Sequence, residues 1–166
     1  LGDPDAVAVL DETGQEKKGE HTAGVARQYV GCAGQVTNAI NIVYCTWASS
    51  RGHAQVGTRV YLPKDWAGDP RRRAGAGVPE AVVFKTKPQL AVDILTDLHT
   101  AGALPPWVTG DEVYGRDPTL RAFCEDREVG YVLGVPCSFP IVLTNEVWVV
   151  ADELGMLTGL RAVALA

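Results

Sequence analysis

Residues 6–11 read AVAVLD, and residues 107–111 read WVTGD. Each stretch is a short apolar run that ends on an aspartate, Asp11 in the first and Asp111 in the second. Short apolar runs bounded by polar residues are typical of buried strands. Because strand ends converge at one edge of an α/β sheet, the two stretches predict neighbouring strands that bring these carboxylates together.

The rest of the chain predicts a hairpin followed by alternating helices and strands. Residues 39–48 and 55–62 are rich in β-branched and aromatic residues on either side of a short polar turn, as in a hairpin. Helical spacing, capping residues and apolar runs predict the remaining elements: a polar loop over residues 12–21, a solvated connection over 64–79, helices over 88–102 and from Asp117, strands over 129–135 and 141–150, and a helix from Asp152 onward. This order indicates an α/β fold, a mixed sheet with helices packed against it.

Composition limits the function classes. The chain has 166 residues, of which 46% are hydrophobic, which is enough for one domain with a real core. It has no long apolar run or secretory signal, so we expect no membrane partner and a cytoplasmic location. The net charge of −5 disfavours bulk electrostatic binding of nucleic acid, so any DNA contact must be local. The four cysteines form no close pair, and we expect them to be buried.

Carboxylates at strand ends suit one kind of chemistry in particular. Reaction at a phosphodiester is helped by two divalent cations, and Mg²⁺ or Mn²⁺ prefers carboxylate oxygens. A rigid strand positions such a ligand better than a loop does. Strand-terminal aspartates are also common as turn formers and helix caps, so spacing alone leaves both interpretations of Asp11 and Asp111 open.

Several longer motifs follow one another along nearly the whole chain. Residues 9–14 (VLDETG), 17–19 (KKG) and 21–29 (HTAGVARQY) resemble the opening of the catalytic domain of IS701-type transposases. The resemblance continues through residues 61–66 (YLPKDW), 71–73 (RRR), 77–80 (GVPE), 86–88 (TKP) and 110–115 (GDEVYG).

The resemblance implies a partial DDE transposase catalytic domain over residues 1–166, with a ribonuclease-H-like fold that is incomplete at its C-terminus. It implies that Asp11 is the first catalytic, metal-binding acid and Asp111 the second, with Mg²⁺ or Mn²⁺ as cofactor. The third acid, a glutamate, is expected beyond Ala166. The neighbouring acids Glu12 and Glu112 are expected to be solvated or capping residues.

The resemblance also implies DNA as the partner, both the element ends and the target. Lys17 and Lys18 follow the first acid closely, and with the cluster of Arg71, Arg72 and Arg73 they are the candidate DNA-binding residues. Ordinary solvated loops are the alternative for both groups.

Two functions follow for a chain with two of three acids. The first is metal-dependent DNA cleavage and strand transfer, in a truncated form that is inactive alone. The alternative is a non-catalytic remnant of an insertion-sequence transposase that folds partly or binds a partner. The coding sequence beyond Ala166 would discriminate between them.

Overall fold

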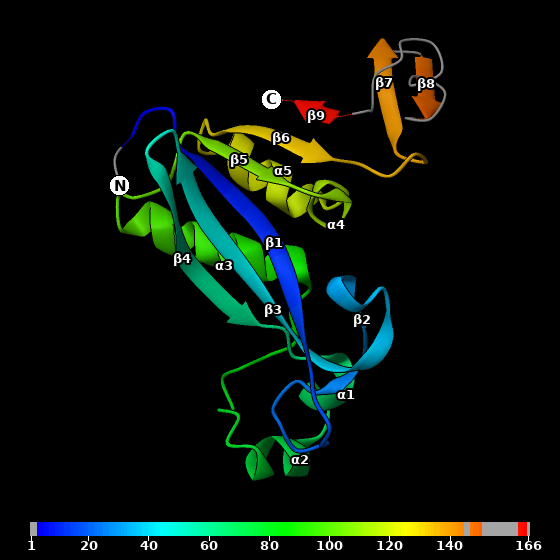
Figure 1. Ribbon diagram of the computed structural model, residues 1–166. Helices are drawn as coiled ribbons and strands as arrows, with labels where there is room; N and C mark the ends of the chain where they lie inside the picture. The colour runs from blue at the N-terminus through cyan, green and yellow to red at the C-terminus, as the bar shows by residue number, and fades with distance from the viewer. Residues whose placement is uncertain (1–2, 145–146, 151–162, 166) are drawn as a thin grey trace.

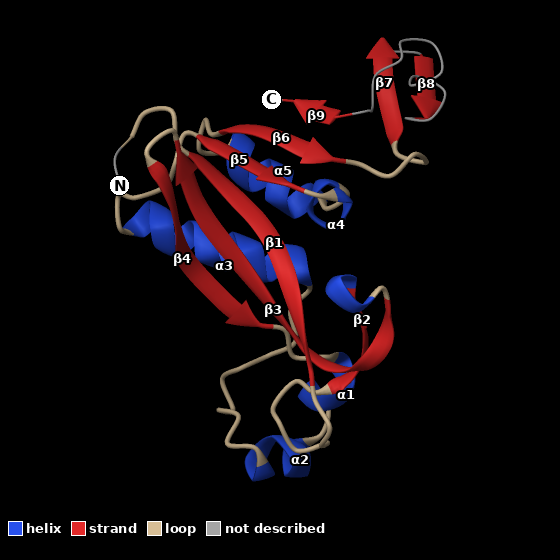
Figure 2. Ribbon diagram, in the orientation of Figure 1, coloured by secondary structure: helices blue, strands red, loops and turns tan. Residues whose placement is uncertain are grey.

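The computed structural model describes residues 3–144, 147–150 and 163–165 as a twisted mixed sheet with helices against one face (Figure 1, Figure 2). The 7-stranded sheet has the order β2-β3-β1-β5-β6-β9, with β4 pairing with β3. Its strands are β1 (Val7–Glu16), β2 (Ala26–Val30), β3 (Gln35–Ser49), β4 (Gly52–Val60), β5 (Trp107–Gly110), β6 (Gly130–Gly134) and β9 (Val163–Leu165). A separate hairpin contains β7 (Pro140–Thr144) and β8 (Val147–Val150).

Strand direction divides the sheet into two parts. β3 runs antiparallel to β1, β2 and β4, so the first half of the chain forms an antiparallel sheet around β3, with hairpins from β2 to β3 and from β3 to β4. β1, β5 and β6 are parallel, and parallel neighbours require crossover connections, which the helices provide. The arrangement confirms the expected ribonuclease-H-like mixed sheet with flanking helices.

The main core lies between this sheet and three helices. They are α3 (Lys87–Thr100), α4 (Glu112–Gly115) and α5 (Pro118–Glu125). α3 begins with a capping box, in which Thr86 accepts from the backbone of Gln89 and the Gln89 side chain accepts from the backbone of Thr86. Its buried face packs on β3 and β4 and joins buried residues of β1 and β5 in the main core, through Leu90, Ala91, Ile94, Leu95 and Leu98. The helices predicted over residues 88–102 and from Asp117, and the predicted hairpin, are therefore confirmed.

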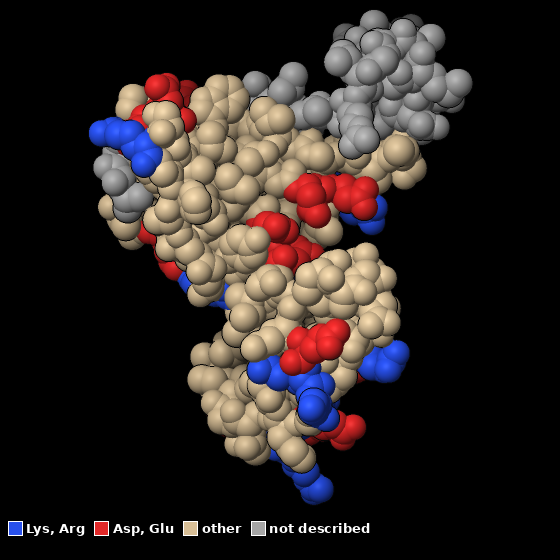
Figure 3. Space-filling view, viewed as in Figure 1, with Lys and Arg blue, Asp and Glu red and all other residues tan. Residues whose placement is uncertain are grey.

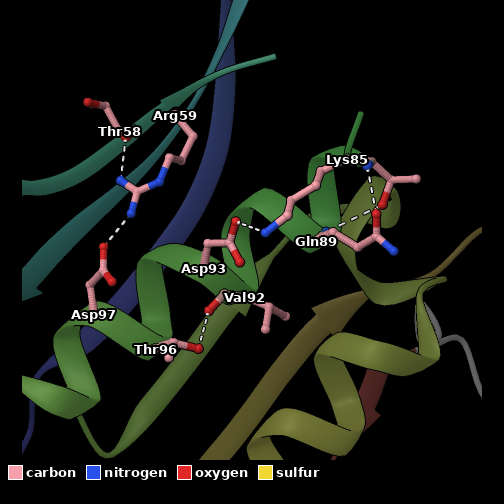
Figure 4. Close-up of polar contacts among 9 residues, drawn as sticks. Thr58, Arg59, Lys85, Gln89, Val92, Asp93, Thr96 and Asp97 are labelled. Carbon is pink, nitrogen blue, oxygen red and sulfur yellow. Dashed lines mark hydrogen bonds and ion pairs between the residues drawn. The ribbon is translucent and has the colours of Figure 1, made fainter. Parts of the chain in front are cut away.

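The outer face of α3 carries polar contacts. Arg59 on β4 pairs with Asp97, Lys85 pairs with Asp93 at 2.6 Å, and Thr96 donates to the carbonyl of Val92 at 2.7 Å (Figure 4). Ion pairs this exposed contribute little to stability. The apolar face of α3 therefore holds it against the sheet.

A second, smaller cluster forms a lobe at the far end of the sheet (Figure 1). It contains β2, a short 3-10 helix η1 (Gly31–Ala33), α1 (Lys64–Ala67) and α2 (Pro70–Gly75). Trp66 is fully buried among Val25, Ile40 and Leu62, and its indole donates to the carbonyl of Val25 at 2.6 Å. The segment over residues 64–79 is largely exposed, as the prediction of a solvated connection requires, but it also forms α1 and α2 and buries Trp66, which the prediction did not include.

Other boundaries also differ from the prediction. β1 does not stop at Asp11 but continues to Glu16, paired with β3 along its whole length. Polar residues remain in a strand there because β3 supplies backbone hydrogen bonds whatever the side chains are. Residues 141–150 fall in two strands rather than one. The helix expected from Asp152 falls mostly on residues outside the described ranges. The described residues 163–165 of that segment form β9.

The cysteines fall into two classes. Cys45 and Cys124 are buried, as expected, and burial raises the pKa of their thiols to about 12 and about 11. Cys32 and Cys137 are exposed, so the expectation of burial was wrong for these two. Within the described part of the chain, no helix is long and apolar enough to cross a membrane.

Close packing of β4 on α3 predicts a stability change. At Gly57 an added Cβ would lie 2.2 Å from Cγ2 of Ile94. We expect Gly57→Ala to lower the free energy of unfolding by about 1–3 kcal/mol, because α3 would have to move away from the sheet. Urea denaturation measures this. Gly31→Ala is the control: nothing lies within 4 Å of its added Cβ, so a loss as large there would contradict the packing argument.

Candidate active site

Two strands of the parallel part of the sheet bring Asp11 and Asp111 together. β1 pairs with β5 in a register that places Leu10 beside Gly110, so each aspartate directly follows the last paired residue of its own segment. β5 ends at Gly110, and Asp111 begins α4, whereas β1 continues past Asp11. The aspartates therefore lie where the pairing of the two strands ends. In Figure 3, acidic side chains gather beside the hollow between the sheet and the lobe.

The side chain of Asp11 is oriented by β3. Tyr44 lies opposite Asp11 in the antiparallel register, and its hydroxyl donates to Oδ2 of Asp11 at 2.9 Å. The backbone N–H of Glu12 donates to Oδ1 at 2.7 Å. Burial raises the pKa of Tyr44, and the bond to Asp11 adds to this effect, so the hydroxyl remains a donor at neutral pH. Asp11 is exposed and can still accept from solvent or a cation.

Asp111 is the N-cap of α4. Its Oδ1 accepts from the backbone N–H of Val113 at 2.9 Å, which fixes the carboxylate at the helix start. Burial raises the pKa of Asp111, and the negative charges of Glu12 and Asp11 raise it further, against the opposing effect of the backbone hydrogen bonds. These three carboxylates thus repel one another, a situation that a bound cation would relieve.

Glu12 is the residue that the sequence interpretation misjudged. It was expected to be solvated or capping, but its side chain is only 20% exposed and both oxygens are engaged. Lys87 pairs with Oε1 at 2.5 Å, and the hydroxyl of Tyr114 donates to Oε2 at 2.9 Å. The hydroxyl of Tyr114 stays protonated and can donate to Glu12, since burial raises its pKa and the charge of Glu12 raises it further. Glu112, in contrast, is exposed, as expected.

The donor set fits a hard cation but does not complete a site. Asp11 and Asp111 offer carboxylate oxygens, the ligands that Mg²⁺ and Mn²⁺ prefer. Among the residues that the structure describes, no group of three histidine, cysteine, aspartate or glutamate side chains is arranged to hold a metal. Two convergent carboxylates are what this part of the chain provides.

Comparison with known proteins places the chain in a family. The model of the DDE superfamily endonuclease family matches residues 1–151. The chain belongs to this family. It is 31% identical over 130 residues to a probable transposase for insertion sequence element IS701 from Microchaete diplosiphon. That alignment covers 78% of this chain but 31% of the relative, so the chain spans about a third of the relative's length. No solved structure matches.

The candidate DNA-binding lysines of this DDE-family chain lie in the turn after β1. Lys17 is half-buried and Lys18 is exposed. The turn is held in shape by Asn38, whose side-chain amide donates to the carbonyls of Lys17 and Gly19 at 2.7 and 3.0 Å. The lysines are thus presented from an ordered turn rather than a loose loop.

The three arginines of residues 71–73 have different environments. Arg72 lies 3.9 Å over the ring of Trp66 and donates to the carbonyls of Glu20 and Val25. Arg73 donates to four backbone carbonyls, those of Ala67, Pro79, Glu80 and Val82. Both guanidinium groups therefore organise the lobe. Arg71 is exposed and, within the described residues, makes no side-chain hydrogen bond.

The capping role of Asp111 can be separated from its charge. Asparagine caps a helix as well as aspartate does, so Asp111→Asn should keep the start of α4 and also remove repulsion from Glu12 and Asp11. We expect its melting temperature at neutral pH to equal or exceed that of the wild type. Asp111→Ala removes the cap and should cost about 1 kcal/mol. Thermal unfolding followed by circular dichroism gives both values, and equal losses in the two variants would refute this assignment.

Proposed function

We propose that this chain supplies the first two metal-binding acids of a transposase that cleaves DNA and transfers strands. Asp11 and Asp111 would hold Mg²⁺ or Mn²⁺ between β1 and the start of α4. The observation that carries the proposal is the parallel register of β1 and β5, which makes two aspartates distant in sequence neighbours in space. Membership in the DDE superfamily endonuclease family supports the same chemistry.

The residues around the two acids suit this role. Tyr44 and the backbone N–H of Glu12 orient one carboxylate, and the first turn of α4 orients the other. Divalent cations held there would activate the attacking oxygen and stabilise the leaving oxygen of a phosphodiester. The third acid would come from outside residues 1–166, so we assign strand transfer to a longer protein and no joining activity to this chain alone.

We further propose that DNA contacts the protein on the side of the lobe that carries Lys17 and Lys18. These cations follow β1, the strand that bears Asp11, so a backbone bound to them would lead toward the acids. Arg71 is the member of the arginine cluster that remains available for a phosphate. Arg72 and Arg73 would act indirectly, by holding the lobe in shape.

Metal binding tests the first part of the proposal. We expect Asp11→Asn and Asp111→Asn each to weaken Mn²⁺ binding by roughly tenfold or more, because each removes one charged ligand from a site with few others. Electron paramagnetic resonance of free Mn²⁺ measures the affinity. Asp93→Asn, which removes an acid from the outer face of α3, is the control and should leave binding unchanged. Equal affinities in all variants would overturn the metal assignment.

Salt-dependent DNA binding tests the second part. The double variant Lys17→Ala/Lys18→Ala should weaken binding to duplex DNA and lower the slope of log affinity against log salt by roughly 1–2, since each lost phosphate contact releases about one counterion fewer. Fluorescence anisotropy over a salt series gives the slope. Arg51→Ala, at the turn between β3 and β4, is the charge control. If the slope falls equally in the Arg51→Ala control, DNA binding depends on the overall charge of the protein and not on contacts made by Lys17 and Lys18.

A further inference from the structure

One carboxylate beside the candidate active site connects three elements. Glu12 is on β1, Lys87 is the first residue of α3, and Tyr114 lies in α4. The two oxygens of Glu12 are bound separately, Oε1 to the ammonium of Lys87 and Oε2 to the hydroxyl of Tyr114. We call this set of three side chains the Glu12 tie.

The Glu12 tie acts on the same short helix that positions Asp111. Tyr114 is fully buried, and its backbone N–H donates to the carbonyl of Asp111 at 3.1 Å. Its ring also packs against Gly110, where an added Cβ would lie 3.2 Å from Cβ of Tyr114. A displacement of Tyr114 would therefore move the first turn of α4 and the carboxylate at its start.

We propose that the Glu12 tie is a positioning device that sets Asp111 against Asp11, and that Glu12 is not itself a metal ligand. The inference rests on the proposed metal site. Asp11 and Glu12 are successive residues of β1, so their side chains leave opposite faces of the strand. Glu12 binds Tyr114 on one face of β1, and Asp11 is held by Tyr44 from the other face. The rigid strand therefore fixes the position of Tyr114 relative to that of Asp11.

The partners of Glu12 also separate its role from that of Asp11. Asp11 is exposed and bonded to neutral donors, which leaves its charge available to a cation. The charge of Glu12 is already balanced by Lys87 in a pair whose side chains are 22% and 20% exposed. To ligate a metal, an oxygen of Glu12 would have to give up or share its contact with Lys87 or Tyr114, which is costly for a partly buried pair. Lys87 thus reduces the negative charge while Asp11 and Asp111 remain free.

The test compares two tyrosines that make the same kind of bond. Tyr131 donates to Oε1 of Glu125 at 2.9 Å, as Tyr114 does to Glu12, but it is on β6 and outside the Glu12 tie. We expect Tyr114→Phe to weaken Mn²⁺ binding by about tenfold and Tyr131→Phe to leave it unchanged. Thermal unfolding of both variants shows whether they are folded at the temperature of the titration. Equal Mn²⁺ affinity in the two folded variants would overturn the proposal.

Substitutions at Lys87 provide a second test of the Glu12 tie, and this test does not require changing the fully buried Tyr114. Lys87→Met releases Oε1 of Glu12, so the proposal expects weaker Mn²⁺ binding even though the added net negative charge alone would strengthen it; Lys87→Arg retains an ion pair with Glu12 and should restore most of the affinity. The variant Glu12→Gln should resemble Tyr114→Phe in size. If Glu12→Gln abolishes binding as Asp11→Asn does, while Tyr114→Phe and Lys87→Met have no effect, Glu12 is a ligand and the tie is refuted. If Asp11→Asn itself has no effect, the metal site fails, and the tie fails with it.

Discussion

The parallel pairing of β1 with β5 is the constraint on which the candidate active site depends. β5 has four residues, and its register is fixed by burial of Val108 beside Ala8 in the core. In a strand, a shift of one residue moves every side chain to the other face, so a slip would expose Val108 and separate Asp111 from Asp11. The core that selects this register draws its largest share of residues from α3, the crossover helix between the two halves of the sheet. Packing far from the acids thus determines their separation.

The same arrangement concentrates negative charge. Asp11, Glu12 and Asp111 are close enough for the first two to raise the pKa of the third, which is unfavourable for the folded chain on its own. Residues in such arrangements are commonly functional, because structural acids are more easily placed apart. Lys87 offsets part of the charge through Glu12. Within the described residues, Asp11 and Asp111 have no cationic partner, whereas Lys87 balances Glu12, and this contrast supports the proposed cation site.

Local signals in the sequence predicted part of this structure. The N-cap Asp117, Pro88 in the first turn of α3, the apolar face of α3 and the β-branched hairpin could be read directly, because each depends on residues close together in the chain. The extension of β1 to Glu16 could not, since its polar residues are held by pairing with distant β3. The environment of Glu12 was missed for the same reason: its partners Lys87 and Tyr114 follow much later. The pattern VLDETG marks two adjacent acids, but only tertiary contacts distinguish them.

In the proposed DNA contact, the arginine cluster would act mainly indirectly. Arginine offers five donors in a planar fork, which suits it to backbone carbonyls that a small lobe leaves without partners. Arg72 uses these donors on the carbonyl of Glu20, at the end of the turn that contains Lys17 and Lys18, while Asn38 holds the beginning of that turn. A protein with a net charge of −5 can attract a phosphate only where cations are held together locally. Arg72 and Arg73 would therefore shape the lobe from which Lys17 and Lys18 are presented.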